Sequence, residues 1–345
     1  MPAKGIFMIA WDPKTGPYIR MAYPQDLGIE QDQELVIKVY GGCVIVERAE
    51  GYHEIVHEKK EIAAYYSGIE LNFILGVLVE GEPASVYRES VITVAPVIFK
   101  KKGLLSDTEW DEIFRIVKSF PKMSSDEKIA YALTDPTKKE ILENVVKRPG
   151  INIQDLRLAL RKIDKNITRA EILGHVDLLE RLGILAKYWV EGDAEPHLTV
   201  AWDVLFSRKT PRGFKELLVK MPELGDAFNE VANRNWQNEQ EDLALTVSLT
   251  DTQSLISQFK DHPVMKKDEL KVPPELTKTY SLLKKLGIIK EIGNLVVLTS
   301  IPTAKKLFPK YIIAKILKMI KNGEFPREES IALLKAMRDT YRRTG

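Results

Sequence analysis

The first residues alternate apolar and polar positions around a turn. GIFMIAW (5–11) and PYIRMAY (17–23) flank the turn Asp12–Gly16, and this pattern predicts a β-hairpin. A helix is expected next, over residues 30–41, because apolar side chains recur there on one helical side. These side chains are Leu35, Val36, Val39 and Tyr40.

Two further strands and two further helices are expected before residue 122. The strands are 61–68 and 71–80, and Asn72 is the only polar residue of the second before Glu80. Such a continuous apolar run is typical of a central strand buried on both faces. Residues 84–101 and 107–120 have helical periodicity.

This order of elements resembles the longin/roadblock family of small α/β modules. The resemblance rests on FMIAWDPKTGPYI (7–19), on the helix that follows it, and on YYSGIELNFILGVLVEGEP (65–83). It implies a central antiparallel sheet flanked by helices. It also implies a platform for protein interaction, often near small GTPases, without catalytic residues.

Residues 128–202 follow a different order, in which three helices precede two strands. Pro136 suits the first position of the first helix (136–148), and Pro149-Gly150 ends it. Asn152 is in the N-cap region of the second helix (152–164). A third helix (168–182) stops at Gly183, and the strands 184–190 and 197–202 flank an acidic turn.

A second, degenerate copy of this order follows further along the chain. Helices are expected at 250–262, 265–272 and 273–287, and a hairpin at 288–299 turns at Gly293-Asn294. The spacing of the third helix and the strand after it is shared between the copies. The matching positions are Val176, Leu179, Gly183, Ile184 and Leu185 in the first copy, and Tyr280, Leu283, Gly287, Ile288 and Ile289 in the second.

Both copies resemble the winged-helix domains of archaeal and bacterial regulators. The first carries ALTDPTKKEILE, INIQDLRLAL and ITRAEILGHVDLLERLGIL in the order that family uses. The expected fold class is therefore α+β, a longin/roadblock-like module followed by two winged-helix domains and a helical tail. The expected boundaries are 1–122 for the module, 123–208 and 248–300 for the winged helices, 209–247 for a helical connector, and 301–345 for a basic tail with helices at about 309–322 and 326–343.

Composition narrows the class of protein. Hydrophobic residues make up 44% and charged residues 29% of the 345 positions, enough for real cores. A single cysteine, Cys43, excludes a disulfide framework and indicates a reducing compartment. No signal peptide and no apolar run of about 20 residues is present, so a cytoplasmic protein without a membrane role is expected. Abundant Lys and Glu also resemble a thermophile's composition.

Charge is distributed unevenly along the chain. Residues 301–345 contain seven Lys and four Arg against three Glu and one Asp, whereas residues 1–125 are slightly acidic. The basic tail, with Arg342 and Arg343 near its end, favours an anionic partner. A solvated helical face is the alternative.

A winged helix binds DNA by placing its third helix in the major groove. In the second copy that helix offers hydroxyls and lysines, and the preceding segment adds two more lysines. The expected nucleic-acid contacts there are Lys266, Lys267, Thr277, Lys278, Thr279, Ser281, Lys284 and Lys285. In the first copy Leu173 and Gly174 stand where DNA-binding relatives place a small polar and a basic residue. Its wing turn Glu191–Pro196 is acidic, so only Arg169, His175 and Arg181 could help DNA binding there.

The helix at 309–322 has an apolar face that includes Ile312, Ile316 and Ile320. Three uses of this face are open. It can pack on the second winged helix, form a homodimer seam, or lie on an anionic membrane. Packing is the default expectation, and a dimer would suit a protein that binds paired half-sites.

One catalytic motif requires comment. His53-Glu54-Ile55-Val56-His57 fits HExxH, which binds zinc when both histidines lie on one helix face. Its neighbours place it in a loop or at a strand start, and no third ligand stands out among Glu70, Glu80 and Glu89. Phosphate-binding glycine loops and a Ser/His/acid arrangement are absent from the sequence. The protein is therefore expected to be no enzyme and to need no cofactor.

Two functions remain. The first is a DNA-binding transcriptional regulator or chromatin-associated protein, which binds double-stranded DNA through winged helices and a protein partner through the N-terminal module. The second is an interaction scaffold of the longin type whose winged helices bind no nucleic acid. The acidic first wing favours the scaffold, while Thr277, Lys278 and the basic tail favour DNA.

Overall fold

The computed structural model contains two compact units, and each mixes helices with strands, as an α+β chain does. The described residues are 3–29, 32–46, 50–226, 229, 236–259 and 262–344. Unit 1 is formed by Met1–Lys122, Glu140–Ala201 and Pro309–Gly345, and unit 2 by Met123–Lys139 and Trp202–Phe308. The N-terminal segment, most of the first repeat and the tail thus belong to one unit.

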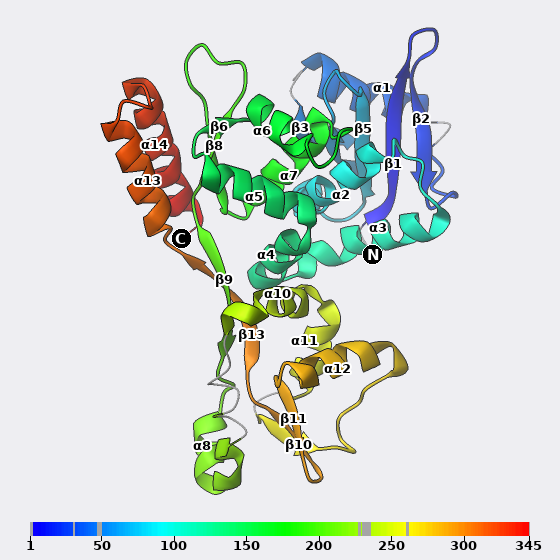
Figure 1. Cartoon of the computed structure of the whole chain (residues 1–345). Coiled ribbons are helices and arrows are strands. Elements are labelled where there is room, and N and C mark those ends of the chain that lie inside the picture. Colours follow the sequence, from blue (N-terminus) through cyan, green and yellow to red (C-terminus); the bar gives the residue numbers. More distant parts are fainter. Residues whose placement is uncertain are drawn as a thin grey trace. The chain divides into compact units, whose positions relative to one another are not determined.

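Unit 1 begins with a five-stranded antiparallel sheet (Figure 1). Its strands are β1 (Ala3–Asp12), β2 (Gly16–Tyr23), β3 (Gly51–His57), β4 (Lys60–Tyr66) and β5 (Phe73–Val79). The order is β2-β1-β5-β4-β3, so the predicted hairpin and the predicted central strand are confirmed. A Cβ atom on Gly76 of β5 would lie 2.3 Å from the ring of Phe7, so this position of β5 requires glycine.

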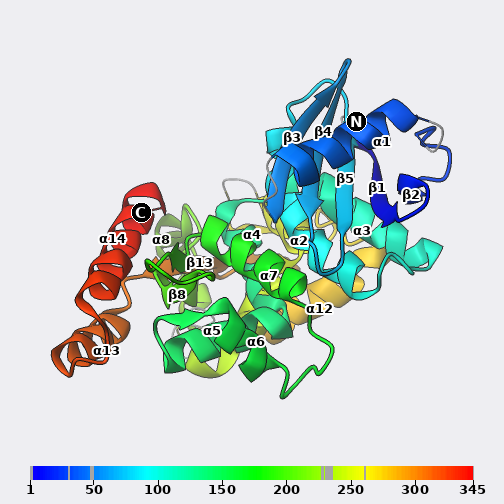
Figure 2. The same cartoon turned by 90° about the horizontal axis from the view of Figure 1, so that it is seen from above.

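Helices cover both faces of this sheet. They are α1 (Gln33–Tyr40), η1 (Gly41–Val46), η2 (Ala84–Tyr87), α2 (Arg88–Lys100), α3 (Asp107–Ser119) and η3 (Phe120–Lys122). Leu35 and Val39 of α1 pack with Ile62 of β4 on one face, whereas Tyr65 of β4, on the opposite face, contacts Phe99 of α2. Figure 2 shows the same layering from above. Residues 30 and 31 of the first predicted helix lie outside the described residues.

The first repeat completes most of unit 1. It consists of α5 (Pro136–Lys147), β6 (Ile151–Asn152), α6 (Ile153–Leu160), α7 (Arg169–Arg181), β7 (Leu185–Tyr188) and β8 (His197–Val200), and the boundary between the units falls within α5. The three strands form a sheet in the order β6-β8-β7. The Asn152 side chain accepts a hydrogen bond from the Asp155 N–H at 2.8 Å, which confirms its predicted capping role.

The tail helices α13 (Lys310–Lys321) and α14 (Arg327–Thr344) pack on this first repeat. The Lys315 ammonium donates to the Val146 carbonyl at 3.1 Å, and the Tyr188 hydroxyl donates to the Glu329 carboxylate at 3.3 Å. The two tail helices bury Ile312 and Ile316 of α13 and Leu333 of α14. The expectation of packing on the second copy was therefore wrong about the partner, because unit 1 contains the tail.

Unit 2 holds the second repeat and the elements around it. Before the repeat come α4 (Ser125–Thr134), β9 (Asp203–Lys209), α8 (Phe214–Lys220), η4 (Pro222–Leu224), η5 (Trp236–Glu239) and α10 (Gln240–Ser248). The repeat and its extension are α11 (Thr250–Ile256), η6 (Ser257–Phe259), β10 (Val264–Lys266), η7 (Pro274–Leu276), α12 (Thr277–Lys285), β11 (Ile289–Ile292), β12 (Leu295–Leu298) and β13 (Ile301–Leu307).

Two sequence expectations for unit 2 were wrong. Residues 265–272 form no helix, because Val264–Lys266 pairs with β12 and a turn follows. The strands β9 and β13 were missed; they pair over seven residues, and β13 precedes the two expected tail helices. Residues 227–228, 230–235 and 260–261 of the predicted connector and helix lie outside the described residues.

The two repeats share their backbone geometry. After the third helix, the Gly183 N–H donates to the Glu180 carbonyl at 2.8 Å, and the Gly287 N–H donates to the Lys284 carbonyl at 2.9 Å. Both glycines have positive φ, 76° and 67°, as a left-handed helix end requires. The sheet orders β6-β8-β7 and β10-β12-β11 also correspond. The third helix, the glycine turn after it and the sheet order thus correspond between the two segments, whereas α6 has no helical counterpart in the second.

The elements that flank the two repeats meet inside unit 2. β9 follows the first repeat and β13 follows the second, and they pair antiparallel about Phe206 and Ala304, shown side by side in Figure 1. α4, which precedes the first repeat, and α10, which precedes the second, also pack together. Equivalent elements thus contact one another, as they do across a twofold axis of a dimer.

Within the described ranges, no helix is long and apolar enough to cross a membrane.

Candidate nucleic-acid interface

Helix α12 presents one polar, exposed face. Its exposed residues recur with helical spacing and combine hydroxyls with ammonium groups. They are Thr277, Lys278, Ser281, Lys284 and Lys285. Leu276, Leu283 and Leu286 are buried on the other side, so the helix is held by its apolar stripe and its polar face is open.

Thr279 departs from its predicted role. Its side chain is only 6% exposed, because it lies on the buried stripe between Leu276 and Leu283. Thr279 therefore stabilises the packing of α12 rather than offering a hydroxyl to a ligand.

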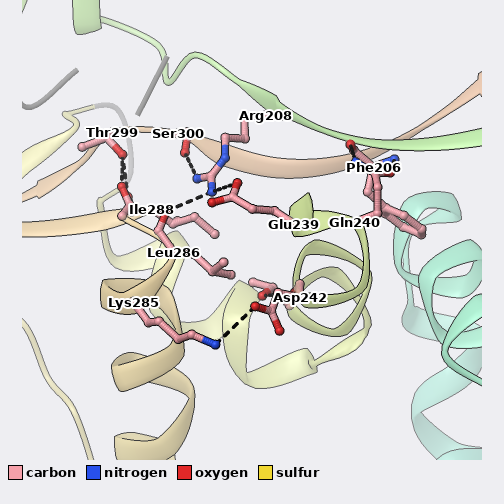
Figure 3. A network of polar contacts seen from close by, with 12 residues as sticks. Phe206, Arg208, Glu239, Gln240, Asp242, Lys285, Leu286, Ile288, Thr299 and Ser300 are labelled. Carbon is pink, nitrogen blue, oxygen red and sulfur yellow. Dashed lines mark hydrogen bonds and ion pairs between the residues drawn. The ribbon is translucent and has the colours of Figure 1, made fainter. Parts of the chain in front are cut away.

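Arg208 anchors the C-terminal end of α12 (Figure 3). Its guanidinium donates to the Leu286 carbonyl at 2.9 Å, to Glu239 at 2.7 Å and to the Ser300 hydroxyl at 3.2 Å. The end carbonyls of a helix lack intrahelical donors, and a cation there also meets the negative end of the helix dipole. This role of Arg208 was not predicted, because its strand, β9, was not recognised in the sequence.

A carboxylate lies beside the lysines of the α12 face. Glu291 of β11 contacts the Lys284 ammonium at 2.8 Å, the Lys267 ammonium at 2.9 Å and the Tyr280 hydroxyl at 2.9 Å. These hydrogen bonds, from Lys284 first, lower the pKa of Glu291 to about 2. Burial, together with Glu291, raises the pKa of Tyr280. Glu291 was not predicted to lie beside these lysines, because it stands before the wing turn and not in it.

The other predicted lysines of this repeat are also exposed. Lys266 ends β10 and Lys267 begins the following turn, so neither starts a helix as expected. Lys285 pairs with Asp242 of α10 at 3.3 Å (Figure 3). Lys278 has no ion pair with any described residue. It is the most available charge on the α12 face.

The corresponding helix of the first repeat, α7, is covered. Its residues Ile172, Gly174, Val176 and Leu179 are buried, and α7 packs along α2 of the N-terminal module. A Cβ atom on Gly174 would lie 2.6 Å from Cγ of Pro96 in α2. This face of α7 is therefore occupied by protein.

Arg169 and His175 of α7 are engaged within unit 1. The Arg169 guanidinium binds both oxygens of Glu195 at 2.9 Å and also pairs with Glu50. His175 is 7% exposed. Glu195 belongs to the acidic wing turn, so part of that negative charge is neutralised internally. Neither Arg169 nor His175 therefore lies on an exposed helix face that could enter a DNA groove.

Arg342 and Arg343 are exposed near the end of α14, in unit 1. Arg343 lies 3.8 Å from Glu180 of α7. The α12 face belongs to unit 2, so neither unit contains both sets of predicted contacts.

The HExxH sequence adopts a strand and not a helix. In β3 its side chains alternate, so His53 and His57 are buried on one face while Glu54 is exposed on the other. Residues four apart in a strand are about 13 Å apart, too far for one zinc ion. Among the described residues, no group of three or more His, Cys, Asp or Glu side chains could hold a metal.

No protein-family model matches the chain, and no curated protein matches its sequence significantly.

Proposed function

We propose that this chain binds double-stranded DNA through the α12 face of its second repeat, acting as a winged helix, and that it has no enzymatic activity. The first repeat is then a structural winged helix that joins the longin/roadblock-like N-terminal module. Chromatin association and transcriptional regulation are the corresponding roles. The order α5-β6-α6-α7-β7-β8 of the first repeat supports its resemblance to a winged helix. The sheet order β2-β1-β5-β4-β3 supports the resemblance of the N-terminal module to the longin/roadblock family.

The contrast between the two third helices carries the proposal. Where α7 places Gly174 under Pro96, α12 places the exposed Lys278, and where α7 places Leu173, α12 places Thr277. A helix that enters a major groove needs an open polar face with cations for phosphate and base edges. Of these two helices, α12 has one.

The test is a salt titration of binding to random-sequence duplex DNA. The wild type is compared with a Lys278→Gln, Lys284→Gln, Lys285→Gln variant and with a matched Lys310→Gln, Lys318→Gln, Lys321→Gln variant of α13. The α12 variant should bind more weakly, with a salt slope shallower by about 2 to 3, because each lysine on a phosphate contributes about 1. The α13 variant should resemble the wild type.

Absence of binding by the wild type at about 50 mM salt contradicts the proposal, because even non-specific binding is strong there. An α13 variant that loses more affinity than the α12 variant contradicts the assignment of the face.

A protein-interaction scaffold is the second candidate, and one observation favours it. An apolar groove of about 730 Å³ in the N-terminal module is lined by Trp11, Ile37, Tyr40, Ile45 and Ile69. Ile69 is 89% exposed and Ile37 60% exposed, and exposed apolar groups of this kind mark interaction sites. If the wild type does not bind DNA, this scaffold function becomes the proposal.

A further inference from the structure

A second cavity lies within unit 1, between the N-terminal module and the first repeat. Its volume is about 770 Å³, within the range of small-molecule sites. One wall comes from β3, β4 and the start of α2, and the other from α7, β7 and the residues after β7. Tyr52, Arg88, Ile92, Leu173, Arg181 and Trp189 are among its lining residues, and we call it the arginine cavity.

The acidic side chains of this cavity already have basic partners. Asp177 and Glu180 bind the Lys187 ammonium at 2.6 and 2.9 Å. Glu50 pairs with Arg169, and Glu70 binds Arg157 at 2.6 Å. Each of these carboxylates thus contacts a basic group inside the protein, with Asp177 and Glu180 sharing the single Lys187 ammonium.

Two arginines of the cavity are not compensated in this way. Arg88 makes no ion pair with any described residue, and its Nε is buried without a hydrogen-bond partner. Arg181 has a long contact to Glu89, at 3.9 Å. A guanidinium keeps its charge at all ordinary pH values, so an uncompensated one favours an anion.

Arg88 is held in place by an aromatic ring. Its guanidinium carbon lies 4.7 Å from the centroid of the Tyr52 ring, a cation–π arrangement. The Tyr52 hydroxyl donates to the Ala84 carbonyl at 3.1 Å, which fixes the ring. The donors of Arg88 are thus preorganised, and a carboxylate or phosphate can accept two of them at once.

Apolar groups line the same cavity and remain open to solvent. Trp189 is 62% exposed and Ile69 is 89% exposed, and Leu173 and Pro196 extend this lining. Such a lining fits an aromatic or aliphatic body attached to the anionic group.

We propose that the arginine cavity binds a small organic anion, with its carboxylate or phosphate on Arg88 and Arg181 and its apolar body against Tyr52, Trp189 and Ile69. The site is independent of the α12 face. Because its walls come from the module and from the first repeat, an occupant holds these two parts of unit 1 together and raises their thermal stability.

The test uses the full chain and five probes in thermal-shift and calorimetric titrations. Indole-3-acetate and phenyl phosphate carry both features, indole-3-acetamide lacks the charge, and acetate and inorganic phosphate lack the ring. The two aromatic anions should bind and raise Tm, and the neutral amide should not. Comparison of the carboxylate with the phosphate identifies the preferred head group.

Arg88→Gln should weaken binding of the preferred probe by roughly 10- to 100-fold, since a charge-assisted hydrogen bond contributes about 1.5–3 kcal/mol. Arg115→Gln, an exposed arginine of α3, is the matched control and should bind as the wild type does. Arg181→Gln gives a second reading if Arg88→Gln does not fold.

Three results overturn the proposal. The first is that neither aromatic anion binds at about 5 mM. The second is that the neutral amide binds as well as its acid. The third is that loss of the arginine charge leaves the affinity unchanged.

Discussion

Gly174 of α7 lies directly against the ring of Pro96 in α2, where a single added methyl carbon would come within 2.6 Å of Cγ. This contact joins the third helix of the first repeat to the N-terminal module. It covers a face of α7 whose equivalent on α12 is exposed.

Gly174→Ala should destabilise unit 1. The proline ring is rigid, so the two helices must separate, at a cost of about 1–3 kcal/mol. Gly41 has open space around its Cβ position and a helical φ of −59°, so Gly41→Ala is the matched control. Chemical denaturation measures both; an unchanged midpoint for Gly174→Ala would disprove the close packing of α7 on α2.

Arg208→Met should destabilise unit 2 and loosen α12. The substitution removes the 2.7 Å ion pair with Glu239 and the hydrogen bond to the Leu286 carbonyl, which costs about 3 kcal/mol for a largely buried pair. Arg212→Met, an exposed arginine of the same unit, should change stability by less than about 0.5 kcal/mol. Hydrogen exchange of α12 amides should rise only in the first variant, and equal exchange in both would refute the anchoring role.

Glu291→Gln should strengthen DNA binding by α12. The Glu291 carboxylate holds Lys267, Lys284 and Tyr280 as a phosphate group would, so it competes with DNA for the same donors. We expect about a 3- to 10-fold gain in affinity at low salt, from roughly 1 kcal/mol of released attraction. Glu216→Gln, an exposed carboxylate of α8, makes the same charge change and should have a smaller effect. Weaker binding by Glu291→Gln would mean that Glu291 positions the lysines instead.

Glu171 should make the stability of unit 1 depend on pH. Burial raises the pKa of this carboxyl to about 6, above its unfolded value of about 4.3. The unfolded chain therefore loses this proton first, so stability falls as pH rises from about 4.5 to 6 and the loss persists above that range.

Glu171→Gln removes this loss. The variant should match the wild type near pH 4 and exceed it by up to about 2 kcal/mol at pH 7.5. Glu143→Gln, at an exposed position of α5, should show no such pH-dependent gain. A constant difference between Glu171→Gln and wild type across this range would contradict the raised pKa.

Local patterns in the sequence carried much of the fold. The first hairpin, the apolar strand β5 and the capped helices could be predicted because alternation, apolar runs and capping residues act within a few positions. The polar face of α12 was predicted for the same reason, since its residues repeat every three or four positions. Thr279 was predicted to be exposed and is buried, although the next residue but one, Ser281, is exposed. A shift of one or two positions along a helix is enough to turn a side chain from solvent to core.

Long-range contacts could not be predicted in this way. Nothing near Gly174 in the sequence identifies Pro96 as its neighbour. β13 contains Pro302, which argues against a strand because proline has no N–H to donate. In this two-stranded sheet β13 pairs only with β9, so one side of β13 is an edge, where proline is tolerated. Glu291 and Arg208 act through residues on other elements, and their roles are visible only when those elements are in place.

α12, and not another surface, is the face proposed to contact DNA. Cys43 is fully buried, so a single introduced cysteine can carry a photo-crosslinker selectively. Ser281→Cys places the crosslinker on the α12 face, and Leu158→Cys places it on the exposed side of α6. We expect a crosslink to duplex DNA from position 281 and little from position 158. Efficient crosslinking from position 158 with none from position 281, under conditions where the chain binds DNA, would contradict this assignment.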